Sequence, residues 1–156
     1  MRKYALFALV ASIFSLDRLT KALVVKNLAV FDSVRVTSFL SIVHSRNLGG
    51  VFGFLNQHQY AKYIFTFLPL AIVAIIIYFI VTSPVFVRAF SLALILAGAL
   101  GNIYDRIVFG NVIDFLDFYY GTYHWYAFNV ADVSICCGIG LWLYVELFGS
   151  KRETDS

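Results

Sequence analysis

Four long apolar segments limit what this chain can fold into. They cover about residues 4–25, 60–81, 85–104 and 130–148, and each is close to the ~20 residues that a helix needs to cross a bilayer. Hydrophobic residues make up 61% of the chain and charged residues only 13%, whereas a soluble domain carries ~25% charged residues. The sequence therefore predicts a single integral membrane domain over residues 1–156, an all-α membrane protein with four transmembrane helices.

The distribution of basic residues predicts how these helices are oriented. An even number of spans places both termini on one side of the membrane. Basic residues flank the segments on that side: Arg2, Lys3, Arg88, Lys151 and Arg152. Because Lys and Arg are enriched in cytoplasmic loops, both termini are predicted to be cytoplasmic. The bias is modest, since the first outer loop also carries basic residues.

The two outer loops, about residues 26–59 and 105–127, are predicted to form structure outside the lipid. Residues 34–43 and 111–120 are rich in β-branched and aromatic residues with partial alternation, as is typical of strands. In the second strand, alternation places Asp114 on one face with three apolar residues. We expect a small extracytoplasmic β-cradle on the outer membrane surface.

The composition also argues against several kinds of site. The two cysteines, Cys136 and Cys137, are adjacent within an apolar run and are expected to be small core residues. No other cysteine or histidine cluster offers ligands for a metal, so neither a metal nor a cofactor is expected. The net charge of +3 is dispersed, without the basic run that is typical of nucleic-acid binding.

Polar residues from several segments are predicted to gather at the outward end of the helix bundle. They are Asp17, Lys21, Asn47, Asn102, Arg106, Asp114, Asn129 and Asp132. Each has an ordinary structural interpretation. Asp17 and Lys21 are four residues apart and can pair on one helix face, and Asn129 with Asp132 can cap a helix. The glycines around Asn47 predict a tight turn.

The two best catalytic candidates are Asp114 and Asp132. Two facing carboxylates cannot both ionise comfortably, so they share one proton. One can then activate a water while the other donates a proton to the developing tetrahedral oxygen. This is the chemistry of aspartic peptidases.

Two other functions use the same residues. In a small transporter or ion channel, Asp17, Lys21 and Asp132 would form a proton or ion relay, although the chain shows no internal repeat. In a non-catalytic scaffold the polar residues would serve packing and capping only. A scaffold would tolerate Asp114→Asn together with Asp132→Asn.

Five motifs occur in order along the chain: DRLTK from Asp17, RNLGGVFG from Arg46, GALGNIYDR from Gly98, VIDF from Val112 and FNVADVSI from Phe128. Together they resemble the lipoprotein signal peptidase (signal peptidase II) family of bacteria. The resemblance implies an enzyme of the bacterial inner membrane with four helices and an outward β-cradle. Its substrates would be prolipoproteins, cleaved immediately before a lipobox cysteine that carries diacylglycerol. Membrane lipids are the other expected partners, and a monomer is expected.

The resemblance also assigns residues. It implies that Asp114 and Asp132 are the catalytic pair. Further positions match the family and are implied to support the pair or contact substrate: Asp17, Lys21, Asn47, Gly98, Asn102, Arg106, Asn129 and Ala131. Gly50 stands where the family often has alanine. Asp105 does not match the catalytic acid, so Asp105→Asn is expected to reduce activity much less than Asp114→Asn.

Overall fold

The computed structural model describes residues 2–48 and 61–149. Its elements in chain order are α1 (Arg2–Asn27), β1 (Ser33–Arg35), β2 (Leu40–Asn47), α2 (Ala61–Thr82), α3 (Phe86–Phe109), β3 (Val112–Tyr120), β4 (Tyr123–His124), α4 (Val130–Tyr144) and a π-helical turn, η2 (Val145–Gly149).

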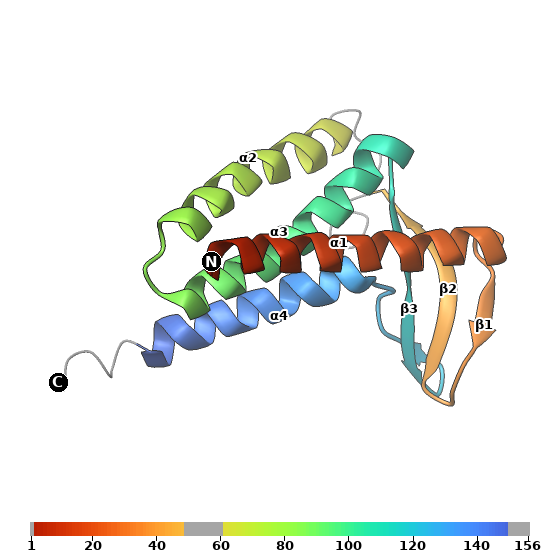
Figure 1. Ribbon diagram of the computed structural model, residues 1–156. Helices are drawn as coiled ribbons and strands as arrows, with labels where there is room; N and C mark the ends of the chain where they lie inside the picture. The colour runs from red at the N-terminus through yellow and green to blue at the C-terminus, as the bar shows by residue number, and fades with distance from the viewer. Residues whose placement is uncertain (1, 49–60, 150–156) are drawn as a thin grey trace.

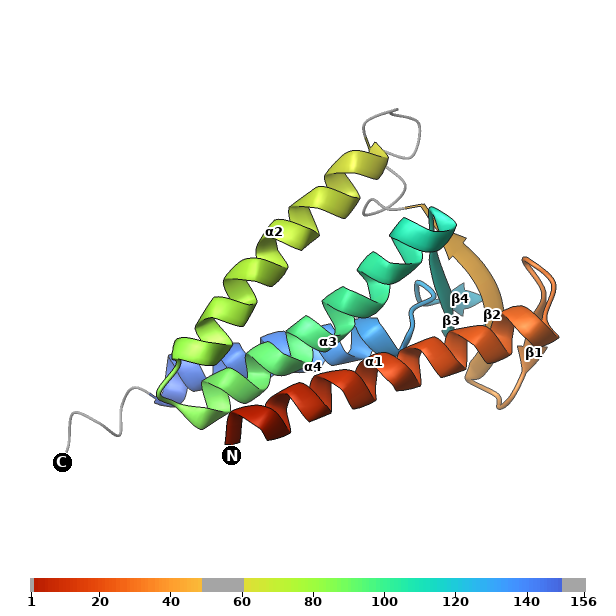
Figure 2. The ribbon, with the colours of Figure 1, turned by 45° about the horizontal axis from the view of Figure 1, so that its top comes forward.

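The helices form a bundle with α3 at its centre, and the sheet lies across one end of the bundle (Figure 1). α3 contacts α1, α2 and α4. The start of α1, the turn between α2 and α3, and the end of α4 lie together at the end away from the sheet (Figure 1). Figure 2 shows that α2 diverges from α3 towards its own N-terminal end.

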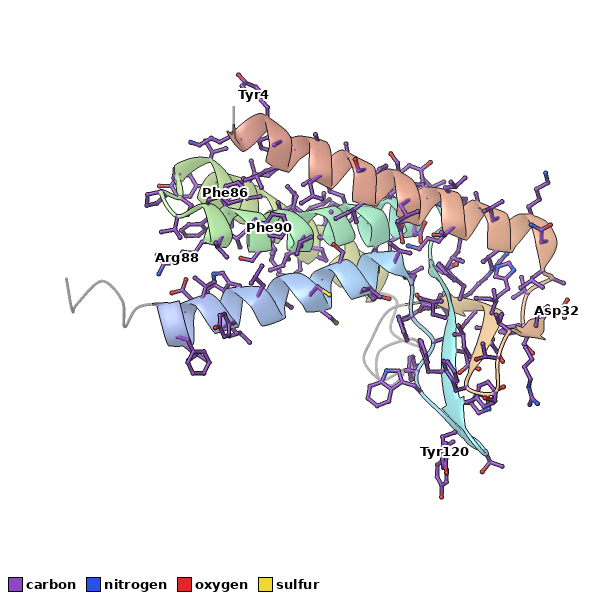
Figure 3. The ribbon with its side chains drawn as sticks, turned by 60° about the horizontal axis from the view of Figure 1, so that its bottom comes forward. Tyr4, Asp32, Phe86, Arg88, Phe90 and Tyr120 are labelled. Carbon is purple, nitrogen blue, oxygen red and sulfur yellow. The ribbon has the colours of Figure 1, made fainter. Side chains whose placement is uncertain are left out.

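The two ends of the molecule differ in the residues they present. Tyr4 and Arg88 lie at the end where α1 begins, whereas Asp32 and Tyr120 lie at the sheet end (Figure 3). The tip of the sheet is rich in exposed aromatic residues: Tyr120, Tyr123, Trp125 and Tyr126. Tyrosine and tryptophan are enriched at membrane–water interfaces, so this composition suits a sheet that lies close to a membrane surface.

The helix core is apolar and made of Leu, Ile, Val and Ala residues. Leu6 and Val10 of α1 and Ile80 of α2 are buried against Ala93 and Leu96 of α3. Outward-facing side chains of the helices are also apolar, which is the pattern of helices that contact lipid rather than water. Within the described residues, two helices are long and apolar enough to cross a membrane, Phe86–Phe109 and Val130–Gly149. The prediction of four helices is thus confirmed, and two of them meet this test.

Glycine allows α3 and α4 to approach closely. A Cβ on Gly98 would lie 2.1 Å from the carbonyl oxygen of Ala131, and one on Gly138 would lie 2.7 Å from the carbonyl oxygen of Ser91. Small residues let helix backbones pack at such distances in membranes. This packing brings the last turns of α3 beside the first turn of α4.

The four strands form an antiparallel sheet in the order β1-β2-β3-β4. In the register of β2 and β3, Ser45 lies opposite Asp114 and Asn47 lies opposite Val112. The register shifts between Ile42 and Ser45. The pairing places the end of β2 next to Asp114.

The first predicted strand, residues 34–43, is wrong as a continuous element. β1 ends at Arg35 and β2 begins at Leu40, because the N–H groups of Val36 and Thr37 both donate to the carbonyl oxygen of Leu40 at 3.0 Å. These bonds close a turn, so the segment forms a hairpin. The second predicted strand, residues 111–120, is confirmed as β3.

The end of the third helix also differs from the prediction. α3 continues to Phe109 and ends at Gly110, whose φ of 74° is the left-handed conformation that glycine adopts readily. Asp105 and Arg106 therefore lie in the last turns of the helix and not in the outer loop. The tight turn predicted at Gly49, Gly50 and Gly53 lies outside the described residues.

Candidate active site

Asp114 is the third residue of β3 and is buried, with 2% of its surface exposed. Its two carboxyl oxygens accept hydrogen bonds from two amides. The Nδ2 of Asn129 donates to Oδ1 at 2.6 Å, and the Nδ2 of Asn47 donates to Oδ2 at 3.1 Å. Asn47 reaches Asp114 because β2 and β3 are paired at this point.

Asp132 lies in the first turn of α4 and belongs to a capping box with Asn129. The backbone N–H of Asp132 donates to Oδ1 of Asn129 at 3.0 Å, and the backbone N–H of Asn129 donates to Oδ2 of Asp132 at 3.2 Å. The predicted cap is therefore confirmed. Asn102 of α3 also donates to Oδ1 of Asp132, at 2.8 Å, so the capping acid is held from a second helix.

Asn129 connects the surroundings of the two carboxylates. It is fully buried. Besides Asp114, its side-chain amide lies 3.2 Å from Oδ1 of Asn102 and 3.3 Å from the carbonyl oxygen of Ile113. One residue thus caps α4, orients Asp132 and donates to Asp114.

Burial and, to a smaller extent, the negative charge of Asp132 raise the pKa of the Asp114 carboxyl, which is about 7 once all its neighbours are included. The hydrogen bonds from Asn47 and Asn129 oppose this rise because they favour the ionised form. The positive charge of Lys21 acts in the same direction. The two carboxylates therefore lie close enough for the charge of Asp132 to act on Asp114.

A buried ion network lies beside the pair. The ammonium of Lys21 is 2.8 Å from Oδ2 of Asp17, 2.8 Å from Oδ2 of Asp105 and 3.2 Å from Oδ1 of Asn102. These three partners match the three N–H groups of an ammonium. The predicted pairing of Asp17 with Lys21 is confirmed. Oδ1 of Asp17 accepts the backbone N–H of Ala131 at 3.0 Å, which ties α1 to the start of α4.

Asp105 and Arg18 belong to this network, although sequence reasoning did not place them there. Asp105 is fully buried, and it accepts from Arg18 and from the backbone N–H of Ile113, the latter at 3.3 Å. Helical spacing could have indicated its position. Residues 98, 102 and 105 are four and three apart, so Asp105 shares a helix face with Gly98 and Asn102.

Three further family positions lie near the carboxylates, with no side-chain hydrogen bond to them among the described residues: Gly98, Arg106 and Ala131. Arg106 interacts electrostatically with Asp132 and Asp114, and its Nε is buried without a hydrogen-bond partner among the described residues. Gly98 packs against the carbonyl oxygen of Ala131. Both small residues therefore set the distance between α3 and α4.

Both carboxylates line a cavity of about 430 Å³. Its walls include Phe128, which precedes α4, and the exposed face of that helix, with Cys136 and Cys137. The expectation that the cysteines are core residues is wrong. Because α4 is apolar on all sides, its sequence pattern did not reveal which face packs against α3.

A second cavity, of about 350 Å³, also reaches Asp114. It is bordered by polar residues of β2, including Ser45 and Asn47, and by His124 and Trp125 beyond β3. Asp114 thus lies between a largely apolar cavity and a polar one.

An apolar helix bundle that holds two interacting carboxylates at one end has the features of a membrane-bound aspartic peptidase. Comparison with known proteins agrees. Residues 9–148 match the family described as Signal peptidase (SPase) II. The chain belongs to this family of aspartic-type peptidases.

Curated relatives match over nearly the full length. A lipoprotein signal peptidase of Francisella tularensis subsp. novicida is 40% identical over 97% of this chain and 96% of its own. One of Solibacter usitatus is 42% identical over 97% of this chain and 94% of its own. One of Haemophilus influenzae is 38% identical, over 90% and 83%.

Two solved structures, both described as a bacterial membrane enzyme, share the fold. The first has a TM-score of 0.83 and 27% identity, covering 96% of this chain and 90% of its own. The second has a TM-score of 0.80 and 28% identity, covering 92% of each. The fold is therefore that of a bacterial membrane enzyme.

Proposed function

We propose that this protein is an endopeptidase of the bacterial inner membrane that cleaves diacylglyceryl-modified prolipoproteins immediately before the modified cysteine. One observation carries the proposal: Asp114 and Asp132 line the same cavity and are both bound to Asn129. The names of the curated relatives, lipoprotein signal peptidases, supply the substrate class.

In the proposed mechanism the pair holds one proton. The ionised carboxylate takes a proton from a water molecule while the water oxygen bonds to the scissile carbonyl carbon. The protonated carboxyl of the pair gives its proton to the carbonyl oxygen. Collapse of the tetrahedral intermediate breaks the C–N bond, and the nitrogen leaves with a proton from the dyad. The pKa of Asp114, raised to about 7, supports a shared proton near neutral pH.

The remaining family positions have supporting roles in this proposal. Asn47, Asn102 and Asn129 orient the carboxyl oxygens through the hydrogen bonds described above. Asp17 and Lys21 fix the start of α4. Two further roles concern the surroundings: Arg106 positions a loop or the substrate backbone, and Gly98 and Ala131 keep α3 close to α4.

We further propose that all four helices cross the membrane, over about residues 4–25, 60–81, 85–104 and 130–148. The sheet then lies on the outer surface and both termini are cytoplasmic. The diacyl chains of the substrate would enter sideways from the bilayer, into the cavity bordered by Cys136 and Cys137. This placement needs no lipid chain to leave the membrane. A single copy of the chain contains both carboxylates, which supports a monomer.

The test is cleavage by the purified protein in detergent micelles. A prolipoprotein carrying S-diacylglyceryl cysteine is compared with the same peptide lacking the lipid, and mass spectrometry locates the cut. The proposal expects a cut before the cysteine in the lipidated peptide only. Ion flux into liposomes without cleavage of either peptide would instead support the transporter alternative.

A further inference from the structure

A third cavity, of about 380 Å³, lies between the end of α1, strand β2 and the end of α3. Neither Asp114 nor Asp132 lines it. Ile113, which does line it, precedes Asp114 in β3, and successive side chains of a strand point to opposite faces of the sheet. The side chains of Ile113 and Asp114 therefore lie on opposite faces of β3.

The lining of this cavity is strongly basic. It includes Arg18, Lys21, Lys26 and Arg46, and no acidic residue lines it among the described parts of the chain. Arg18 and Lys21 are neutralised by the buried ion network. Lys26 and Arg46 are exposed, and neither forms an ion pair with the residues that the structure describes. The cavity thus carries uncompensated positive charge.

Two buried side chains of the lining each have a polar atom without a partner in the described structure. His44 is 2% exposed, and its Nδ1 donates to the carbonyl oxygen of Leu28 at 2.9 Å, which leaves Nε2 unpartnered. Asn111 is 8% exposed, and its Nδ2 donates to the carbonyl oxygen of Phe109 at 2.9 Å, which leaves Oδ1 unpartnered. Buried polar groups are rarely left unpaired, so each such atom calls for a ligand or water.

The remaining lining residues are apolar and lie where the helices would face lipid. Ala22 and Val25 of α1 and Phe109 of α3 line the cavity and are exposed. A ligand that fits both features has an anionic group for the basic residues and an apolar part for this rim. A free anion would leave the apolar rim without a partner.

We propose that this cavity binds the headgroup of an anionic phospholipid of the outer leaflet, one whose headgroup carries hydroxyls. Its phosphate faces Lys26 and Arg46, and hydroxyls of its headgroup donate to the two unpartnered acceptors, Nε2 of His44 and Oδ1 of Asn111. The acyl chains lie along Val25 and Phe109. The inference rests on the membrane placement proposed above but not on the peptidase chemistry.

The test measures lipid binding to the full-length protein, purified in a non-ionic detergent, by native mass spectrometry. Short-chain phosphatidylglycerol is compared with phosphatidylcholine of the same chains and with inorganic phosphate. We expect phosphatidylglycerol to be retained about tenfold more strongly than phosphatidylcholine, and not to be displaced by inorganic phosphate. Lys26→Gln and Arg46→Gln should each weaken retention about fivefold, which is about 1 kcal/mol for one basic residue near a lipid surface.

Arg35→Gln is the matched control, because Arg35 is an exposed arginine of the neighbouring strand β1 that does not line the cavity. Its retention of phosphatidylglycerol should equal that of the wild type. Equal loss in Arg35→Gln, equal retention of the two lipids, or displacement by inorganic phosphate would each overturn the proposal. Binding is measured instead of cleavage because Arg46 also borders the polar cavity beside Asp114. A failure of the peptidase assay would therefore leave this result unaffected.

Discussion

Replacement of Asn129 separates its two roles, as cap of α4 and as hydrogen-bond donor to Asp114. Asn129→Ala removes both. Asn129→Ser keeps a side-chain oxygen that can accept the N–H of Asp132, but it removes the amide that donates to Asp114. The two variants therefore differ only in the cap.

The structure sets the expected magnitudes. Loss of an N-cap costs about 1 kcal/mol. Loss of a donor to a buried group costs about 1–3 kcal/mol. We expect Asn129→Ala to lower the free energy of unfolding by about 2–4 kcal/mol, and Asn129→Ser by about 1–3 kcal/mol. Thermal unfolding in detergent micelles should thus rank the wild type above the serine variant and the serine variant above the alanine variant.

The same variants should shift the pH dependence of the enzyme. The hydrogen bond from Asn129 favours ionised Asp114 and so lowers its pKa, against the larger effect of burial. Without this bond the pKa of Asp114 rises above about 7, and the alkaline limb of kcat/KM moves to higher pH. If activity is too low, the infrared band of the protonated carboxyl provides the same titration. Equal destabilisation by serine and alanine, or an alkaline limb that stays in place, would refute this account of Asn129.

Three further outcomes are expected. Gly98→Ala places a methyl group 2.1 Å from a backbone carbonyl oxygen of α4 and should lower the free energy of unfolding by about 1–3 kcal/mol. Gly140→Ala is the control, because a Cβ at Gly140 would meet open space, and it should be neutral or stabilising in the same thermal unfolding assay. Asp105→Asn removes a buried charge that faces Lys21 and should lower the free energy of unfolding by up to about 3–5 kcal/mol. Cleavage per folded molecule should fall much less than in Asp114→Asn. Equal loss of cleavage in the two variants would contradict the assignment of Asp114, and not Asp105, as a catalytic acid. The stability that protonated Asp114 contributes is complete below its ordinary pKa of 3.8 and is lost as the pH rises through about 7. Asp114→Asn should therefore flatten the pH dependence of the free energy of unfolding in this range. A slope that persists in the variant would assign the pH dependence to another group.

The helices could be predicted because their signal is local. The apolar segments are long, and the observed α2 (Ala61–Thr82) lies within a residue of its predicted limits, 60–81. The end of α3 could not be predicted in this way. Its last turns carry Asp105 and Arg106, which look like loop residues until the tertiary structure buries Asp105 in an ion network. A charge at a helix end is ambiguous when its partner lies on another helix.

The candidate site was predictable where one element contains both partners. The pairing of Asp17 with Lys21 follows from their spacing of four, and the cap formed by Asn129 and Asp132 follows from their spacing of three. Contacts between residues of different helices or strands could not be predicted from spacing along the chain. The bond from Asn129 to Asp114 depends on how β3 packs beside the start of α4.

The orientation of α4 was not predictable for a related reason. Cys136 and Cys137 were expected in the core, but they are exposed and line the cavity beside the carboxylates. An apolar helix that faces lipid on one side and protein on the other carries no polar stripe to distinguish them. The packed face is marked by the small buried residues Ala131, Ser134 and Gly138, which contact α3.

The most direct test of the carboxylate pair is cleavage of diacylglyceryl-modified prolipoprotein by the wild type, Asp114→Asn, Asp132→Asn and the control Asp32→Asn. Asp32 is exposed at the sheet end of the molecule, and it lines none of the three cavities described above. We predict that wild type and Asp32→Asn cleave at similar rates, while neither dyad variant cleaves although both remain folded. Cleavage that survives in a folded Asp114→Asn or Asp132→Asn variant would contradict the assignment of the pair.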